Sequence, residues 1–278
     1  MTPNTGVGRL ADLFLLDESE RCEWLLMPIR TVGGNLAVPA NGYLDETEHD
    51  DIVGVGGWLG TFESWQRFEP RWKALLPPEA KGDFHYTDFW HDPKHWSVNW
   101  PHARRLEFIK SLAELVVQHA SFGMGIVISN SEYERIIPNE FKRDLRGSVY
   151  FCLGHCLRLL IGHYNKLPAR PPAPLLFMHD SKKGKEAWIA EWYYTVRNKF
   201  HQDNVLGDLS FGRRQHEPVL QAADLLVGEL RRHREGHSSQ VVEILQRKRN
   251  ILVAFPDEAQ MRDMVTAALE GPDIEQPE

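Results

Sequence analysis

Two apolar runs joined by a short acidic link constrain this fold more than any other feature. The first, residues 42–47, ends in the adjacent carboxylates Asp45 and Glu46, and the second, residues 52–59, follows after a few polar residues. Such a pair predicts a β-hairpin. Because neighbouring side chains of a strand point to opposite faces, only one of the two acids can face a given pocket without a bend, and we favour Asp45. An acid at the end of a buried strand needs a compensating partner such as a divalent cation; an ordinary turn acid is the alternative.

Beyond the hairpin, apolar runs of helix length alternate with runs of strand length. The predicted helices are 63–76, 101–119, 144–164, 186–200 and 218–234, and the predicted strands are 121–129, 174–180 and 205–211. This succession predicts one α/β domain over residues 41–236, with a mixed sheet of about five strands flanked by helices. We expect residues 1–40 to form an N-terminal extension and residues 237–278 a C-terminal helical extension, with an extended segment at 250–255.

Composition limits the classes of protein that this chain can belong to. Its 278 residues are 42% hydrophobic and 26% charged, which is typical of a globular protein. The net charge of -7 argues against a protein covered in nucleic-acid-binding charge, although a local basic groove is compatible with it. No apolar run reaches the roughly 18 residues of a membrane span, and the N-terminus lacks the pattern of a secretory signal. We therefore expect a cytoplasmic protein without a membrane partner.

The three cysteines do not suggest a disulfide framework. Cys152 and Cys156 are four residues apart on a predicted helix, with His155 between them, and Cys22 stands alone. A zinc site would need a further pair of ligands at suitable spacing, which the sequence lacks. Free cysteine is among the most buried residue types, so we expect Cys152 and Cys156 in the core.

Two further carboxylates complete a candidate metal site. The strand predicted over 174–180 ends in Asp180, and the helix predicted from Pro218 carries Asp224 among small apolar residues. Glu217, Gln221 and Asp224 are spaced four and three residues apart, so they share one helix face. Asp45, Asp180 and Asp224 would thus come from two strands and one helix, which is how sites for hard cations are assembled.

The segment from residue 82 to residue 100 is dense in aromatic and ionisable side chains. In Asp83-Phe84-His85-Tyr86 the polar and aromatic residues alternate, and a strand would place them on opposite faces. An aromatic satellite core with surface histidines and the rim of a functional site are equally good interpretations of this segment.

Five segments together resemble a known family. In chain order they are Tyr43-Leu44-Asp45-Glu46-Thr47, Val53-Gly54-Val55-Gly56-Gly57, Asp83-Phe84-His85, the strand ending at Asp180, and Leu220-Gln221-Ala222-Ala223-Asp224-Leu225-Leu226. Over about residues 41–235 the chain resembles the bacterial and phage family catalogued as a domain of unknown function, DUF3800, which looks like a member of the ribonuclease H-like superfamily. Thr47 and Glu48 replace the family's usual Ser-Gly, and the middle motif begins with Asp83 instead of glutamate.

The resemblance implies metal-dependent phosphodiester chemistry, with Mg²⁺ or Mn²⁺ held by Asp45, Asp180 and Asp224. Glu46, Asp83, His85 and Glu217 are the further candidates for ligand or proton transfer. The residues that could hold phosphates are Lys182, Lys183, Lys185, Arg213, Arg214 and Gln221, and for each of the basic residues a solvated charged face is the alternative. Three functions follow: a nuclease acting on DNA or RNA in mobile-element or defence biology, a non-catalytic module that binds nucleic acid or protein, and a hydrolase of a small phosphorylated molecule.

Overall fold

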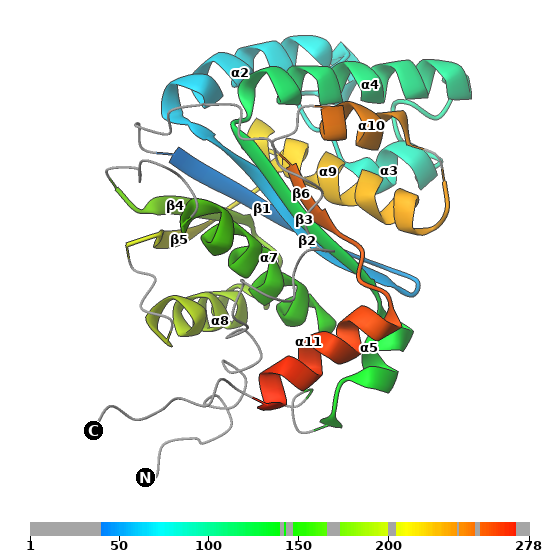
Figure 1. Ribbon diagram of the computed structural model, residues 1–278. Helices are drawn as coiled ribbons and strands as arrows, with labels where there is room; N and C mark the ends of the chain where they lie inside the picture. The colour runs from blue at the N-terminus through cyan, green and yellow to red at the C-terminus, as the bar shows by residue number, and fades with distance from the viewer. Residues whose placement is uncertain are drawn as a thin grey trace.

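A single mixed sheet organises the part of the chain that the structure describes. The structure is a computed structural model describing residues 40–270, apart from 140–141, 143–146, 166–172, 200–203, 238 and 248–250. Within these residues the strand order is β5-β4-β1-β2-β3-β6 (Figure 1). The strands are β1 (Ala40–His49), β2 (Ile52–Thr61), β3 (Phe122–Ser129), β4 (Leu175–Asp180), β5 (Leu206–Gly212) and β6 (Ile251–Ala254). The predicted α/β fold with a mixed sheet is confirmed, with a sixth strand added.

The predicted hairpin is confirmed, and its register is regular from Ala40↔Thr61 to His49↔Ile52. Asp50 turns the chain with a φ of 50°, in the left-handed region that aspartate tolerates. Asp45 lies in the middle of β1 and not, as predicted, near its end. On the side of β1 that faces β4, however, the parallel pairing stops at Leu44↔His179, and Asp45 is the next residue of β1.

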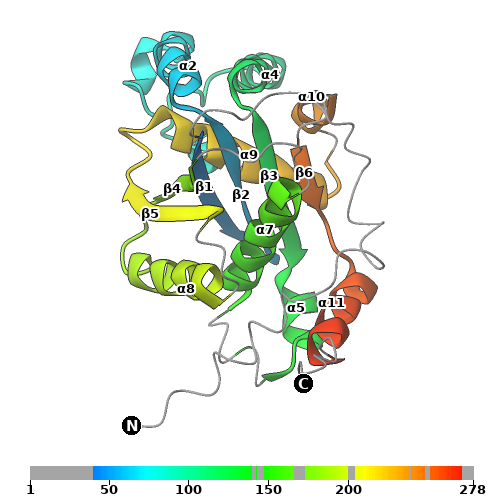
Figure 2. The same ribbon diagram turned by 60° about the vertical axis from the view of Figure 1, so that its left-hand side comes forward.

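Helices cover both faces of the sheet (Figures 1 and 2). One face carries α2 (Phe62–Leu75), α3 (Tyr86–His91), α4 (His102–His119), α9 (Pro218–Arg234) and α10 (Gln240–Arg247). The other face carries α5 (Asn130–Ile136), α7 (Ser148–Asn165), α8 (Glu186–Lys199) and α11 (Glu258–Glu270). Two faces buried by helices are the expected arrangement for an α/β sheet of this kind.

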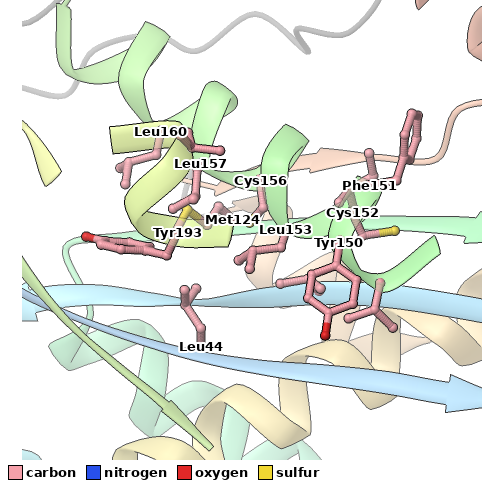
Figure 3. Close-up of a cluster of buried hydrophobic side chains, with 14 of the residues drawn as sticks. Leu44, Met124, Tyr150, Phe151, Cys152, Leu153, Cys156, Leu157, Leu160 and Tyr193 are labelled. Atoms are coloured by element: carbon pink, nitrogen blue, oxygen red, sulfur yellow. The ribbon is translucent and has the colours of Figure 1, made fainter. Parts of the chain in front are cut away.

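On the α7 face, the core is formed by large apolar side chains. Leu44 of β1 and Met124 of β3 lie beneath Leu153 and Leu157 of α7 (Figure 3). Cys156 is buried in the same cluster as Cys152, which confirms the core interpretation of these cysteines. Burial raises the pKa of the Cys156 thiol to about 12.

On the opposite face, glycines let α9 approach the sheet closely. A Cβ on Gly125 would lie 2.5 Å from Leu230, and a Cβ on Gly56 would lie 3.0 Å from Val227. The indole of Trp58 also donates to the carbonyl of Ala222 on α9 at 3.0 Å. The glycines of β2 and β3 therefore leave room for Val227 and Leu230 of α9 against the sheet.

Other parts of the chain differ from the sequence-based expectation or lie outside the description. Residues 83–85 are irregular and lead into α3, although Phe84 and Tyr86 are buried as the alternation predicted. In the predicted C-terminal helical extension, residues 251–254 form β6, which pairs with β3. The N-terminal extension lies outside the described residues except for Ala40, as does Cys22. No helix among the described residues is long and apolar enough to cross a membrane.

Candidate functional site

Asp45 and Asp180 lie together where β4 ends and β1 continues beyond it. The last paired residues of these parallel strands are Leu44 and His179, so each aspartate is the next residue of its strand. Tyr43 and Met178, two residues earlier, both pack on the α9 side of the sheet. Because side chains alternate along a strand, Asp45 and Asp180 face α9 as well. Both residues are at least 92% buried, with exposed fractions of 2% and 8%.

Asp224 of α9 reaches the same place from above. Its Oδ2 accepts a hydrogen bond from the backbone N–H of Tyr86 at 2.8 Å and lies 3.8 Å from Nη1 of Arg214. Burial and then repulsion by Asp45 raise the pKa of Asp224 to about 7, against the opposing effects of His85 and Arg214. The structure thus brings Asp180 of β4 and Asp224 of α9 within electrostatic range of Asp45 of β1.

Asp180 experiences the same repulsion. Burial and then Asp45 raise the pKa of the Asp180 carboxyl, while the backbone N–H of Arg214 donates to its Oδ1 at 3.0 Å and limits the rise. Arg214 follows β5 and also approaches Asp83, whose Oδ1 lies 3.7 Å from the Arg214 Nε atom. This arginine is therefore the cation shared by Asp83, Asp180 and Asp224.

Lys182 closes the edge of the sheet beyond the end of β4. Its Nζ donates to the backbone carbonyl of Glu46 at 2.9 Å and lies 3.2 Å from Asp45 Oδ1 and 3.3 Å from Glu46 Oε1. Burial alone would lower the pKa of Lys182, but Asp45 and Glu46 together raise it above its ordinary value. Because it lies at the edge, one ammonium contacts two acids on opposite faces.

Glu46 points to the α7 side of the sheet, as strand alternation predicts, and not toward Asp45. Its carboxylate, 1% exposed, lies 3.5 Å from Nε2 of His179 and 3.9 Å from Nζ of Lys185. His179 is fully buried, and its Nδ1 lies 2.9 Å from the carbonyl oxygen of Asp180. His179 was not among the predicted site residues, although it directly precedes Asp180 and shares its strand face with Phe177 of the core.

His85, the residue before α3, pairs with an acid in the first turn of that helix. Nδ1 of His85 lies 2.7 Å from Asp88 Oδ2, and His85 is close enough to Asp224 to oppose the rise in its pKa. Glu217 lies elsewhere: it caps the start of α9 without a side-chain hydrogen bond, and burial followed by Glu69 of α2 raises its pKa. No contact places Glu217 with the three aspartates among the described residues.

Gln221, predicted to bind substrate, is used inside the protein. Its Oε1 accepts from the indole of Trp72 at 2.8 Å, and its Nε2 donates to the carbonyls of Gly82 and Arg214 at 2.9 and 3.0 Å. The side chain is 0% exposed. We therefore assign Gln221 the structural role of joining α2 and the loop before α3 to α9. Lys183 and Arg213, by contrast, are exposed.

The donor set suits a hard divalent cation in its chemistry, because three carboxylates rise from rigid elements and no thiol lies among them. Within the described part of the chain, however, no group of three or more His, Cys, Asp or Glu side chains is already arranged to hold a metal ion. Lys182 and Arg214 instead supply the positive charge around the aspartates. Comparison of the chain with protein-family models, curated proteins and solved structures gave no match.

Proposed function

We propose that this protein is a phosphodiester hydrolase that depends on Mg²⁺ or Mn²⁺, with Asp45, Asp180 and Asp224 as the metal ligands. The observation that carries the proposal is the meeting of these three buried carboxylates at the end of β4, where its pairing with β1 stops. Burial, followed by repulsion from Asp45, raises the pKa values of Asp180 and Asp224, and a bound cation would favour their charged forms. The mixed sheet with helices on both faces is compatible with the ribonuclease H-like fold that the sequence resembles.

A bound divalent cation would supply electrostatic stabilisation for a phosphoryl group in this site. The chain's own residues have three further tasks. Arg214 lies beside Asp180 and Asp224 and is placed to contact a phosphate oxygen. Asp88 holds Nδ1 of His85, which leaves Nε2 of that partly exposed ring to accept or give a proton. Lys182 holds Asp45 in position from the sheet edge.

The test compares hydrolysis of labelled single-stranded DNA, duplex DNA and RNA in Mn²⁺, in Mg²⁺ and in excess chelator. We expect metal-dependent cleavage that falls at least about 100-fold in Asp45→Asn and in Asp224→Asn, because each loses a ligand. Asp208→Asn is the matched control, since the Asp208 side chain is 82% exposed and pairs with Arg197. It should cleave like the wild type.

Thermal unfolding gives a second measurement that does not need turnover. Mn²⁺ at about 100 times its dissociation constant should stabilise the wild type by about 2.7 kcal/mol and leave Asp45→Asn/Asp224→Asn unchanged. Absence of cleavage on all substrates, or equal cleavage by the wild type and both single variants, would contradict the proposal.

A non-catalytic binding module is the second candidate, and the positions of Lys182 and Arg214 favour it. These two cations already neutralise part of the acidic charge without any ion. In that case nucleic acid or a protein partner would bind equally well to the wild type and to Asp45→Asn/Asp224→Asn, and Mn²⁺ would stabilise neither.

A further inference from the structure

Arg231, near the C-terminal end of α9, is buried without adequate partners. Its side chain is 2% exposed, its Nη1 has no hydrogen-bond acceptor, and its Nε lies 3.7 Å from Glu235 Oε1. A buried guanidinium with an unused donor is costly, because the group has lost water without gaining an equivalent acceptor. The carboxylate of Glu235 therefore compensates the Arg231 guanidinium only in part.

Other cationic and aromatic groups surround Arg231. Arg232 lies with its guanidinium carbon 4.5 Å from the ring centroid of Trp90. His91, the last residue of α3, stacks on His49 of β1 with 6.0 Å between ring centroids. Burial, followed by Arg231 and His49, lowers the pKa of His91, which shows that His91 and Arg231 are neighbours. The indole N–H of Trp90 also has no hydrogen-bond partner.

The same surface continues to the start of α4. The Trp90 ring lies 5.6 Å from the ring of His102, and Arg104 lies 3.9 Å above the ring of Trp100. Arg105 holds this segment in place by donating to the backbone carbonyls of Phe89, Trp90 and Val98. Trp90, Trp100 and Arg232 are partly exposed and Arg104 is exposed. Because Arg104 and Arg232 lie over the two tryptophan rings, this surface presents guanidinium planes and positive charge to a ligand.

We propose that this aromatic–arginine surface, formed by Trp90, Trp100, Arg104 and Arg232 next to the buried Arg231, binds single-stranded nucleic acid. Sequence-tolerant single-strand binding combines positive charge for phosphates with ring or guanidinium planes on which bases stack. Bases of a duplex are already stacked on each other, and an acidic peptide has no bases. The charges and rings present here therefore favour a single strand over both.

The position of this surface makes it a substrate-binding extension of the site, and in this respect the inference rests on the proposed hydrolase function. Arg231 follows Asp224 by seven residues of α9, which is about 10 Å along the helix axis. His49 follows Asp45 on the same face of β1, about 13 Å along the strand. A single strand of a few nucleotides is long enough to span this separation.

The experiment measures fluorescence anisotropy of a labelled 15-mer of thymidine in excess chelator, so that binding is separated from cleavage. We expect Arg104→Gln/Arg232→Gln to weaken binding at least about tenfold and to reduce the salt slope by about 1.4, because each phosphate contact to a single strand contributes about 0.7. Arg262→Gln is the matched control, since Arg262 is exposed on α11 and pairs with Glu258. It should bind like the wild type.

Three competitors identify what is bound. An abasic 15-mer should bind at least about fivefold more weakly than thymidine, because stacking on rings is lost. A duplex of the same length and polyglutamate should also bind more weakly. Equal binding of the abasic strand, the duplex or polyglutamate would overturn the inference, and so would unchanged binding by Arg104→Gln/Arg232→Gln with a wild-type circular dichroism spectrum.

Failure of this inference can be told apart from failure of the proposed function. Metal-dependent hydrolysis of bis(4-nitrophenyl) phosphate without binding of the thymidine 15-mer would contradict the inference and support the hydrolase function. Thymidine binding by the wild type and by Asp45→Asn/Asp224→Asn, with no hydrolysis of any substrate, would do the reverse.

Discussion

Gly228 on α9 gives a sharp test of how the site is held together. A Cβ added there would lie 2.1, 2.4 and 2.6 Å from Cδ1, Cγ and Cε1 of Tyr86, whereas ordinary contacts begin near 3.4 Å. The ring cannot move freely, because Tyr86 is 0% exposed and its hydroxyl donates to Glu229 Oε1 at 2.6 Å. Its backbone N–H holds Asp224 at 2.8 Å. Gly228→Ala must therefore displace a residue fixed at both ends.

Three contributions set the expected magnitude. Overpacking of a filled site costs about 1–3 kcal/mol. Loss of the hydrogen bond between Tyr86 and the buried Glu229 costs about 1–3 kcal/mol. Replacing glycine by alanine inside a helix returns about 1 kcal/mol. We expect Gly228→Ala to lower the free energy of unfolding by about 3 kcal/mol.

Urea unfolding followed by circular dichroism at 222 nm measures this change, and a double-mutant cycle with Tyr86→Ala isolates its cause. Once the ring is removed, the added methyl group has space, so Gly228→Ala should stabilise the Tyr86→Ala protein by up to about 1 kcal/mol. The sign of the effect should therefore reverse between the two backgrounds. A neutral Gly228→Ala substitution in the wild type, or the same loss in both backgrounds, would refute the steric reasoning.

Two further substitutions test the packing around α9. Trp72→Phe keeps a ring but removes the donor to Oε1 of the fully buried Gln221, so the free energy of unfolding measured in urea should fall by about 1–3 kcal/mol. The control Trp188→Phe, at a 49% exposed position, should change it by less than about 0.5 kcal/mol. Equal losses in the two variants would contradict this role of Gln221. Burial raises the pKa of Glu229 in the folded protein, so the folded state binds its proton more tightly and stability falls as pH rises above the ordinary glutamate value. Glu229→Gln should reduce that fall between pH 4 and pH 8 in urea titrations, and an unchanged slope would refute it.

The parts of the fold that the sequence predicted are those encoded locally. The hairpin followed from two apolar runs and their acidic link, and α9 begins at Pro218 and ends at Arg234 as predicted. Both depend on periodicity and on turn or breaker residues within the segment itself. The short helix α3 was missed because its six residues are too few for a period of 3.6 to show, and exposure alternates through the preceding residues.

The contents of the site were harder to predict because they depend on contacts between distant segments. Glu217, Gln221 and Asp224 do share a face of α9, but seven residues of helix span about 10 Å, so one face meets several different neighbours. Glu217 lies beside Glu69, Gln221 contacts Trp72, and only Asp224 reaches the other aspartates. Spacing along a helix shows which residues share a face. Which residues of other segments that face contacts depends on how the helix packs on the sheet.

The role of Lys182 illustrates the same limit. In sequence it belongs to a basic run after Asp180, which suggested a phosphate ligand. In the fold, β4 stops while β1 continues, and the uncovered edge of β1 presents one backbone carbonyl and two carboxylates that point to opposite faces. The ammonium group at the end of the long, flexible Lys182 side chain contacts the carbonyl and both carboxylates, whereas the two carboxylates would repel a phosphate. Because β4 ends before β1, Lys182 contacts Asp45 and Glu46 and supports Asp45, whereas the sequence suggested a phosphate ligand.

The charge balance of this edge also explains why a metal function is the better proposal. Asp45, Asp180 and Asp224 are buried together, and two of them have raised pKa values despite the nearby Lys182 and Arg214. Apolar side chains at these positions would avoid that repulsion, since buried ionic groups are seldom the most stable choice. The loss of folding stability caused by burying three acids together has a physical reason if these acids bind a cation. A role confined to holding the fold together would give no reason to gather three acids where two cations do not fully compensate them.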